Sequence, residues 1–350
     1  MSVFKSFGAD DVVTANPTEV TTGLWSGNTG SLSMFYTSLP QATGSTSGQY
    51  YWNVYNINPS SSDAAIQFAV AYGHRLGGGN TTLTVNQNST LSTEATYLQY
   101  RNLLLDPNDA QFTFAGNYNS DQIYVINIAR AQLRQTLDPG NWQLTLKGAN
   151  GTFTFIDDSG QTLGAVFGHA GSVFNVASGS IGGATGATIV GSASANGGFG
   201  LVYPELGLIV LNPAAIAATI GMVSGSYIVS GSTWFAPNTG SLVTSYNHAG
   251  LFNAIVGGQS FLARSAEDIS STHYFCRLGN KEFNYSNNPS FYDATSGNVT
   301  NTDFIQNPIT YPTTIGMYNA SNELLAVGKL SSPVQKSFAS ELLVRVRLDW

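Results

Sequence analysis

Residues 142–160, WQLTLKGANGTFTFIDDSG, decide the fold class of this chain. Apolar residues alternate with polar ones through both halves of the stretch, at Trp142, Leu144, Leu146, Phe153 and Phe155. A period of two residues is typical of β-strands, because successive side chains of an extended chain point to opposite faces. The run from Asp157 to Gly160 then supplies turn-forming residues. The stretch predicts meander-like, antiparallel β structure.

Alternating or continuously apolar runs predict further strands at 50–55, 64–72, 207–211, 310–318, 323–330 and 342–350. The strands on either side of Asn319 to Asn322 form a hairpin across that four-residue turn. The last strand keeps its alternation to the final residue, so we expect it to pair within a sheet. We expect Val346 to face the core there, and the substitution Val346→Asp to cost several kcal/mol.

Helices are expected at three places between the strands. One covers 93–104 and ends before an Asp-Pro pair. A second covers 129–137 and stops at the turn 138–141, where proline fixes φ and glycine permits the reversal. A third begins at Pro213, with Asn212 as its N-cap. The expected fold is mainly β with a few short helices, built of antiparallel sheets in a sandwich-like or barrel-like arrangement.

The chain has 350 residues, more than the roughly 250–300 at which a single hydrophobic core stops growing, so we expect more than one domain. Residues 1–165 are predicted to form an N-terminal arm plus a β-rich domain. The arm, up to residue 48, is rich in Gly, Ser and Thr and is a candidate for packing on another subunit. Residues 166–260 form a glycine-rich middle region with a strand–helix element, and residues 261–350 form a C-terminal β domain.

Only 9% of the residues are charged, against roughly 25% in an ordinary soluble protein, while the hydrophobic fraction of 42% is close to normal. Uncharged polar residues hydrogen-bond to neighbouring surfaces without the desolvation cost of an ion, which suits a protein covered by partners. The 13 basic residues are dispersed and the net charge is −7, which argues against a nucleic-acid partner. The most apolar stretch, 206–229, is interrupted by Asn212 and Pro213, which argues against a membrane span.

No motif of the sequence predicts catalysis, a cofactor or a metal ion. The histidines have no second ligand at i+3 or i+4, and they stand far apart at positions 74, 169, 248 and 273. The glycine-rich run 73–80 lacks the Gly-Lys-Ser/Thr ending of a P-loop and is interpreted as a turn. The single cysteine, Cys276, excludes an intrachain disulfide and is interpreted as a small core residue.

Pairs of acidic residues occur at 10–11, 157–158 and 267–268. Adjacent acids on a strand point to opposite faces, and acids in turns usually accept backbone hydrogen bonds, so we expect no glycosidase-like pair. A polysaccharide lyase or hydrolase would need several acids or histidines to converge in one cleft. We therefore expect a non-enzymatic protein, with no catalytic residue and no cofactor.

The aromatic cluster Tyr50, Tyr51, Trp52 and Tyr55 is the best candidate for a carbohydrate-binding patch, because sugar rings stack on aromatic faces. The alternative is that these side chains alternate into a β core and a protein–protein interface, and we favour that alternative.

Several phrases of the sequence together resemble one protein family: INIAR (126–130) before LDPGNW (137–142), YPELGLIVLN (203–212), ARSAED (263–268) before FNYSNNP (283–289), TIGMYN (314–319), KLS (329–331) and VRVRL (344–348). They are similar to virion structural proteins of contractile-tailed phages that infect cyanobacteria and other marine bacteria. The resemblance covers residues 50–350 and is strongest over the last 90 residues.

The resemblance implies a non-enzymatic component of the phage particle, located in the tail at the baseplate. Its partners would be other virion structural proteins and copies of itself, with neither nucleic acid nor membrane among them. Because the N-terminus lacks the apolar run of a signal peptide, we expect assembly in the host cytoplasm and a final location in the virion. The alternative function is a carbohydrate-binding adhesin or tail-fibre module.

Overall fold

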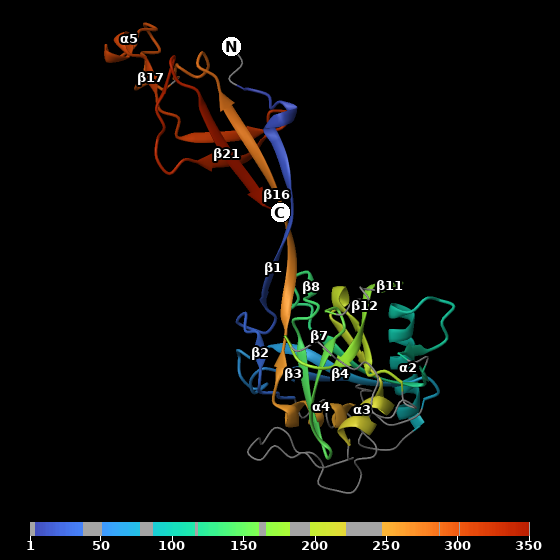
Figure 1. Cartoon of the computed structure of the whole chain (residues 1–350). Coiled ribbons are helices and arrows are strands. Elements are labelled where there is room, and N and C mark those ends of the chain that lie inside the picture. Colours follow the sequence, from blue (N-terminus) through green and yellow to red (C-terminus); the bar gives the residue numbers. More distant parts are fainter. Residues whose placement is uncertain are drawn as a thin grey trace. The chain divides into compact units, whose positions relative to one another are not determined.

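The computed structural model describes residues 4–37, 51–77, 87–115, 118–160, 166–182, 197–221, 247–286, 288–300 and 302–349. The chain forms two compact units (Figure 1). Unit 1 consists of Met1–Glu19 together with Asp268–Trp350, and unit 2 consists of Val20–Glu267. Both units are mainly β, and the paired strands with a described register are antiparallel, as the sequence predicted.

This division differs from the predicted domains. The expected boundary at 260/261 lies close to the observed one after Glu267, but the boundary at 165/166 falls inside unit 2. The first 19 residues belong with the C-terminal residues because β1 (Val12–Gly23) lies next to β16 (Arg264–Leu278) in one sheet. A pairing between strands some 250 residues apart leaves no local signal in the sequence.

Unit 2 is built on an 11-stranded sheet. Its strands lie in the order β2 (Ser31–Leu32), β15 (Phe261–Leu262), β9 (Gln143–Gly148), β10 (Gly151–Asp157), β12 (Gly171–Ser178), β13 (Gly200–Tyr203), β14 (Leu208–Leu211), β7 (Gln122–Ile128), β4 (Ile66–His74) and β3 (Tyr51–Tyr55), with β11 (Val166–Gly168) on β12. The remaining strands of the unit are β5 (Phe112–Phe114), β6 (Tyr118–Ser120) and β8 (Thr136–Leu137).

Each face of this sheet carries its own hydrophobic core. On one face α3 (Pro213–Ile220) and α4 (Asn247–Gly258) cover the larger core, and on the other face α2 (Gln87–Leu104) covers the smaller one. Figure 1 shows α3 and α4 side by side below the sheet, with α2 to the right. In β14 Ile209 belongs to the first core and Val210 to the second, which explains why this strand is apolar throughout.

The stretch that predicted the fold forms the hairpin of β9 and β10, with Phe153 opposite Leu146. The predicted turn that follows is built around Asp157, whose buried carboxylate accepts hydrogen bonds from Trp142 Nε1 at 2.5 Å and from the Gly140 backbone N at 2.9 Å. Backbone and indole donors therefore satisfy this acid. Among the described residues, Asp157 forms no ion pair with a basic side chain.

Two of the three predicted helices are present. Helix α2 includes the predicted 93–104 but begins six residues earlier, and α3 begins at Pro213 with the Asn212 side chain accepting from Ala214 N at 3.2 Å. The prediction of a helix at 129–137 was wrong. That segment forms turns and strand β8, because its backbone pairs with β16, where Leu137 lies opposite Ser265.

Two further features of unit 2 are a short helix and a glycine-rich run. The short helix η3 (Pro204–Leu206) joins β13 to β14. The glycine-rich run begins inside β4, where a Cβ at Gly73 would lie 2.8 Å from the backbone N of Tyr97, so the glycine permits close packing of α2. Residues 78–80 of that run lie outside the described residues.

Among the described helices, none has the length and apolarity needed to cross a membrane.

Gly258 marks an equally close approach between α4 and β9, and it carries a test of the packing. A Cβ there would lie 2.0 Å from the backbone O of Thr145. In an open helix a Gly→Ala change stabilises by up to about 1 kcal/mol. Here we expect Gly258→Ala to destabilise unit 2 by about 1–3 kcal/mol, measured by urea unfolding. The control is Gly30→Ala, where nothing lies within 4 Å of the added Cβ. Equal stability of the two variants would contradict the packing of α4.

Unit 1 contains most of β1, most of β16 and all of β21 (Leu342–Asp349), and these strands lie in the order β1, β16, β21. The smaller pairs are β17 (Ile309–Thr310) with β20 (Lys336–Ser337) and β18 (Thr314–Tyr318) with β19 (Leu324–Lys329), and the short helices are η1 (Ala9–Asp11) and α5 (Asp303–Gln306). The predicted hairpin is confirmed, with Met317 opposite Ala326. The predicted C-terminal strand is also confirmed, and Val346 pairs with Tyr274 of β16.

The prediction for Val346 needs a correction. β21 alternates between half-buried and exposed side chains, and Val346 is half-buried rather than in a core. A Cβ at Gly328 of β19 would lie 3.8 Å from Cγ2 of Val346, at ordinary van der Waals distance, so the hairpin lies over this side chain. An aspartate at 346 would remain partly hydrated, and its cost is correspondingly smaller than for a fully buried charge.

Candidate functional site

Unit 1 has an unusual distribution of apolar side chains. Among its described residues only Phe291 and Met317 are buried hydrophobics, and neither hydrophobic core of the chain includes a residue of unit 1. Unit 1 holds less than a third of the chain, yet more than half of the exposed large hydrophobic side chains among the described residues belong to it. A domain of this size normally buries its apolar residues.

Four of these exposed side chains belong to the hairpin of β18 and β19, and we call them the apolar surface of unit 1: Tyr318, Leu324, Leu325 and Val327. Phe338 and Leu343 are exposed elsewhere in unit 1. In β19 the alternation places Leu325 and Val327 on the outward face, whereas Ala326 and Gly328 turn inward and are half-buried. The period of two therefore exposes large side chains and covers small ones, the reverse of the pattern in a strand that faces a core.

The interior of unit 1 is polar instead. Lys336 is fully buried, and its Nζ donates to Asn284 Oδ1 at 2.9 Å, to Ser337 O at 2.9 Å and to Asn280 O at 3.2 Å. Thr310, also buried, donates to the backbone O of Phe283 at 2.8 Å. Hydrogen bonds hold these loops in place, but they contribute less to stability than apolar burial of the same extent.

The described N-terminal residues of the predicted arm contact the C-terminal part of unit 1. Lys5 Nζ lies 2.5 Å from Glu282 Oε2, and Asp11 Oδ1 lies 2.6 Å from Arg277 Nε. The Lys5 hydrogen bond lowers the pKa of Glu282, and the Gly8 backbone N–H, followed by Arg277, lowers that of Asp11. Residues 38–48 of the arm lie outside the described residues.

The ring of Phe4 meets that of Tyr318 edge-on at 4.8 Å, and the ring of Phe7 lies 5.5 Å from that of Tyr274. Phe4 and Phe7 nevertheless remain exposed. The N-terminal segment therefore borders the apolar surface of unit 1 and adds to it.

The predicted aromatic cluster is divided by the sheet. Trp52 is 7% exposed and packs in the larger core, with its ring 5.1 Å from that of His248 and 5.8 Å from that of Phe252. It cannot stack on a sugar from solution, so the core interpretation of this residue holds. Tyr51 points to the other face and is exposed, and Tyr55 is half-buried. Tyr50 lies outside the described residues.

A pocket of about 480 Å³ lies on the face to which Tyr51 points. Its floor is a row of cross-strand neighbours, Asn53 of β3, Ala69 of β4 and Asn127 of β7. Tyr100 of α2 forms one side, and its hydroxyl hydrogen-bonds the Asn127 side chain. Burial raises the pKa of Tyr100, so this hydroxyl is neutral at physiological pH.

The cysteine and the acidic residues considered in the sequence analysis form contacts that hold the fold together. Within the described part of the chain, no three His, Cys, Asp or Glu side chains lie close enough to hold a metal ion. Cys276 is half-buried in β16, and burial followed by the nearby Asp11 charge raises the pKa of its thiol. Asp158 accepts from both the backbone and the side chain of Asn175, at 2.8 Å each, and Glu267 pairs with Arg134 at 3.2 Å.

Tyr51 belongs to the aromatic cluster expected from the sequence, whereas Tyr100 and Asn127 were not expected as site residues. A signal for Asn127 was present, since this amide interrupts the otherwise apolar strand Ile123 to Ile128. Tyr100 could be found only after α2 had been placed on the sheet. Comparison with known proteins adds nothing to this picture: no family model, curated protein or solved structure matches the chain.

Proposed function

We propose that the chain is a non-enzymatic structural subunit of a tailed-phage particle, located at the tail baseplate. It acts through contacts that unit 1 makes with copies of itself and then with other virion proteins. The observation that carries the proposal is the apolar surface of unit 1. The described residues of this unit include only two buried hydrophobic side chains, so unit 1 exposes most of its large apolar residues. Large exposed apolar patches are typical of protein–protein interfaces.

The edges of the unit 1 sheet support the same function. Among the described residues its strand order begins with β1 and ends with β21. Such edge strands present backbone N–H and C=O groups that can pair with another chain. Because β1 and β21 are different strands on opposite edges, β1 of one copy can pair with β21 of the next, which is a head-to-tail contact of the kind that closes into rings.

The low charge of the chain is mainly a property of unit 2, because unit 1 holds 17 of the 33 charged residues. Charged residues are depleted in the centres of interfaces, because each buried ion loses hydration. The contacts of unit 1 are therefore assigned to its apolar surface and not to a low content of charge. The resemblance of the C-terminal phrases to virion structural proteins supports a phage particle as the assembly, and its strongest part, the last 90 residues, includes the C-terminal segment of unit 1.

Purified particles of the phage that encodes this chain provide the test. We expect mass spectrometry of density-gradient-purified virions to find the chain in a fixed ratio to the tail proteins, because a structural subunit occupies a set number of positions. The ratio should survive a second gradient and a protease wash, which remove adhering host proteins. Loss of the chain on repurification would refute the proposed function.

A further inference from the structure

The pocket on unit 2 exists because α2 covers only part of its face of the sheet. Ile123 and Val125 of β7 lie under the helix in the smaller core, whereas Asn127, two residues on, points to the same face and is exposed. Ala69 and Ala71 on the neighbouring strand are too small to fill the space beside it. The volume of about 480 Å³ lies within the range of small-molecule sites, about 300–1,000 Å³.

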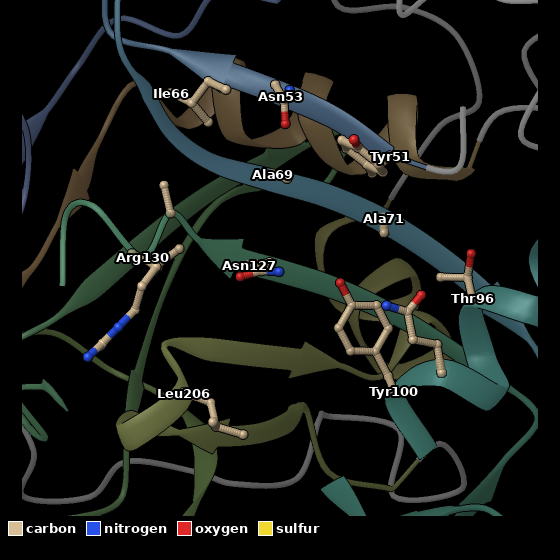
Figure 2. Close-up of a pocket in the computed structure, with 13 residues that line it drawn as sticks. Tyr51, Asn53, Ile66, Ala69, Ala71, Thr96, Tyr100, Asn127, Arg130 and Leu206 are labelled. Atoms are coloured by element: carbon tan, nitrogen blue, oxygen red, sulfur yellow. The ribbon is translucent and has the colours of Figure 1, made fainter. Parts of the chain in front are cut away.

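Two tyrosines border this space from different elements. Tyr51, 48% exposed, comes from β3, and Tyr100, half-buried, comes from α2. Figure 2 shows them on opposite sides of Ala71. Each therefore offers part of a ring and a hydroxyl group to the pocket, and Tyr100 is held in position by its hydrogen bond to Asn127.

The polar groups of the lining are almost all uncharged. The amides of Asn53, Asn127 and Gln99 and the hydroxyl of Thr96 line the pocket, and Arg130, at the opposite end from Thr96 in Figure 2, is its one charged lining residue. An amide offers two donor hydrogens and two acceptor lone pairs, so the bond from Asn127 to Tyr100 leaves capacity for a ligand. Arg130 donates one hydrogen bond, to Gln135 O at 3.5 Å, and is exposed.

We propose that this pocket binds a short saccharide, with one sugar ring held between Tyr51 and Tyr100. A sugar presents C–H groups on its faces and hydroxyls around its edge, and the pocket presents aromatic rings at two sides and amides at the floor. A highly phosphorylated ligand would need more cations than Arg130. Hydrolysis of the sugar would need two carboxyl groups, and the described lining residues contain none, so the proposed role of the site is binding.

The inference is independent of the assembly role of unit 1, because every lining residue belongs to unit 2. In a phage particle a saccharide site would supply a contact with the polysaccharide of a host surface. A chain that binds no saccharide would not contradict the proposed assembly function, and a chain that does not assemble would still contain the pocket.

Saturation-transfer NMR on the full chain tests the proposal with six probes: glucose, galactose, mannose, N-acetylglucosamine, glucuronate and galacturonate. We expect at least one to receive saturation from the protein and to bind in the millimolar range or tighter. Two variants should each weaken that binding by at least tenfold. Tyr51→Ala removes one ring, and Ala69→Leu fills the floor without removing any polar group.

The matched control is Phe167→Ala, which removes an 81% exposed aromatic ring of β11 that does not line the pocket. It should bind as the unchanged chain does, and all three variants should keep the same circular dichroism spectrum and melting temperature. If no probe receives saturation, or if Ala69→Leu and Tyr51→Ala bind like the control, the saccharide site is refuted. Preference for the two uronates over the neutral sugars would identify Arg130 as the carboxylate partner.

Discussion

The double substitution Leu325→Glu and Val327→Glu is expected to turn an assembling chain into a folded monomer. Both side chains are exposed, at 68% and 59%, and they lie two residues apart on the outward face of β19. In the monomer the two glutamates stay hydrated and cost little. Between two copies each would lose hydration without a partner, a penalty of several kcal/mol, which is enough to reduce association by a factor of a thousand or more.

Light scattering coupled to size-exclusion chromatography measures this change, with circular dichroism to verify the fold. The matched control places the same two charges on unit 2, as Leu98→Glu and Leu103→Glu on exposed positions of α2. The control should assemble like the unchanged chain. An unchanged oligomer in the β19 variant, or equal loss in both variants, would refute the role of the apolar surface of unit 1.

Lowering the pH from 7.5 to 5 is expected to destabilise unit 2 by about 2 kcal/mol through His248. This histidine is fully buried, and neither ring nitrogen has a hydrogen-bond partner among the described residues. Burial lowers its pKa from 6.5 to about 4. Between these two pKa values the unfolded chain binds a proton at His248 and the folded chain does not. The contribution of His248 to the free energy of unfolding is therefore fully present above pH 6.5 and decreases as the pH falls toward 4.

Urea unfolding of the unchanged chain and of His248→Phe at both pH values isolates this effect. Phenylalanine keeps a ring beside Trp52 and removes the titration, so the variant should lose about 2 kcal/mol less between pH 7.5 and 5. His169→Gln, an exposed position, is the control and should behave like the unchanged chain. The lowered pKa values of Asp11, Glu282, Asp293 and Asp349 affect stability only at lower pH. Identical pH dependence with and without His248 would contradict its burial as a neutral ring.

Local patterns predicted the strands because burial on one face leaves a period of two in the sequence. In β3 the same period places Trp52 on the core side and Tyr51 on the other side, but the sequence did not indicate which of these aromatic residues faces the core. The cap at Asn212 was predictable for a similar reason, since an Asn-Pro pair before an apolar run satisfies the first turn of a helix without any distant partner.

The predictions that were wrong or missing concern segments whose structure depends on distant contacts. Residues 129–137 have the composition of a helix, but Gln132 donates to Ser26 Oγ at 3.1 Å, and the backbone N of Arg134 donates to Ser265 Oγ at 3.0 Å. These partners lie more than 100 residues away, and they override local propensity. Unit 1 combines the N-terminal and the C-terminal segments of the chain, and Tyr51 and Tyr100 line one pocket although they are 49 residues apart. Both arrangements depend in the same way on contacts between distant segments.

If the apolar surface of unit 1 packs against other copies of the chain, the purified 350-residue chain forms an oligomer in solution. Sedimentation equilibrium over a concentration series from about 0.1 to 50 μM measures its mass. We expect a discrete species whose mass is a whole multiple of 37.0 kDa and which dissociates on dilution without unfolding. A single 37.0 kDa species over the whole series, with unit 1 folded, would contradict this packing.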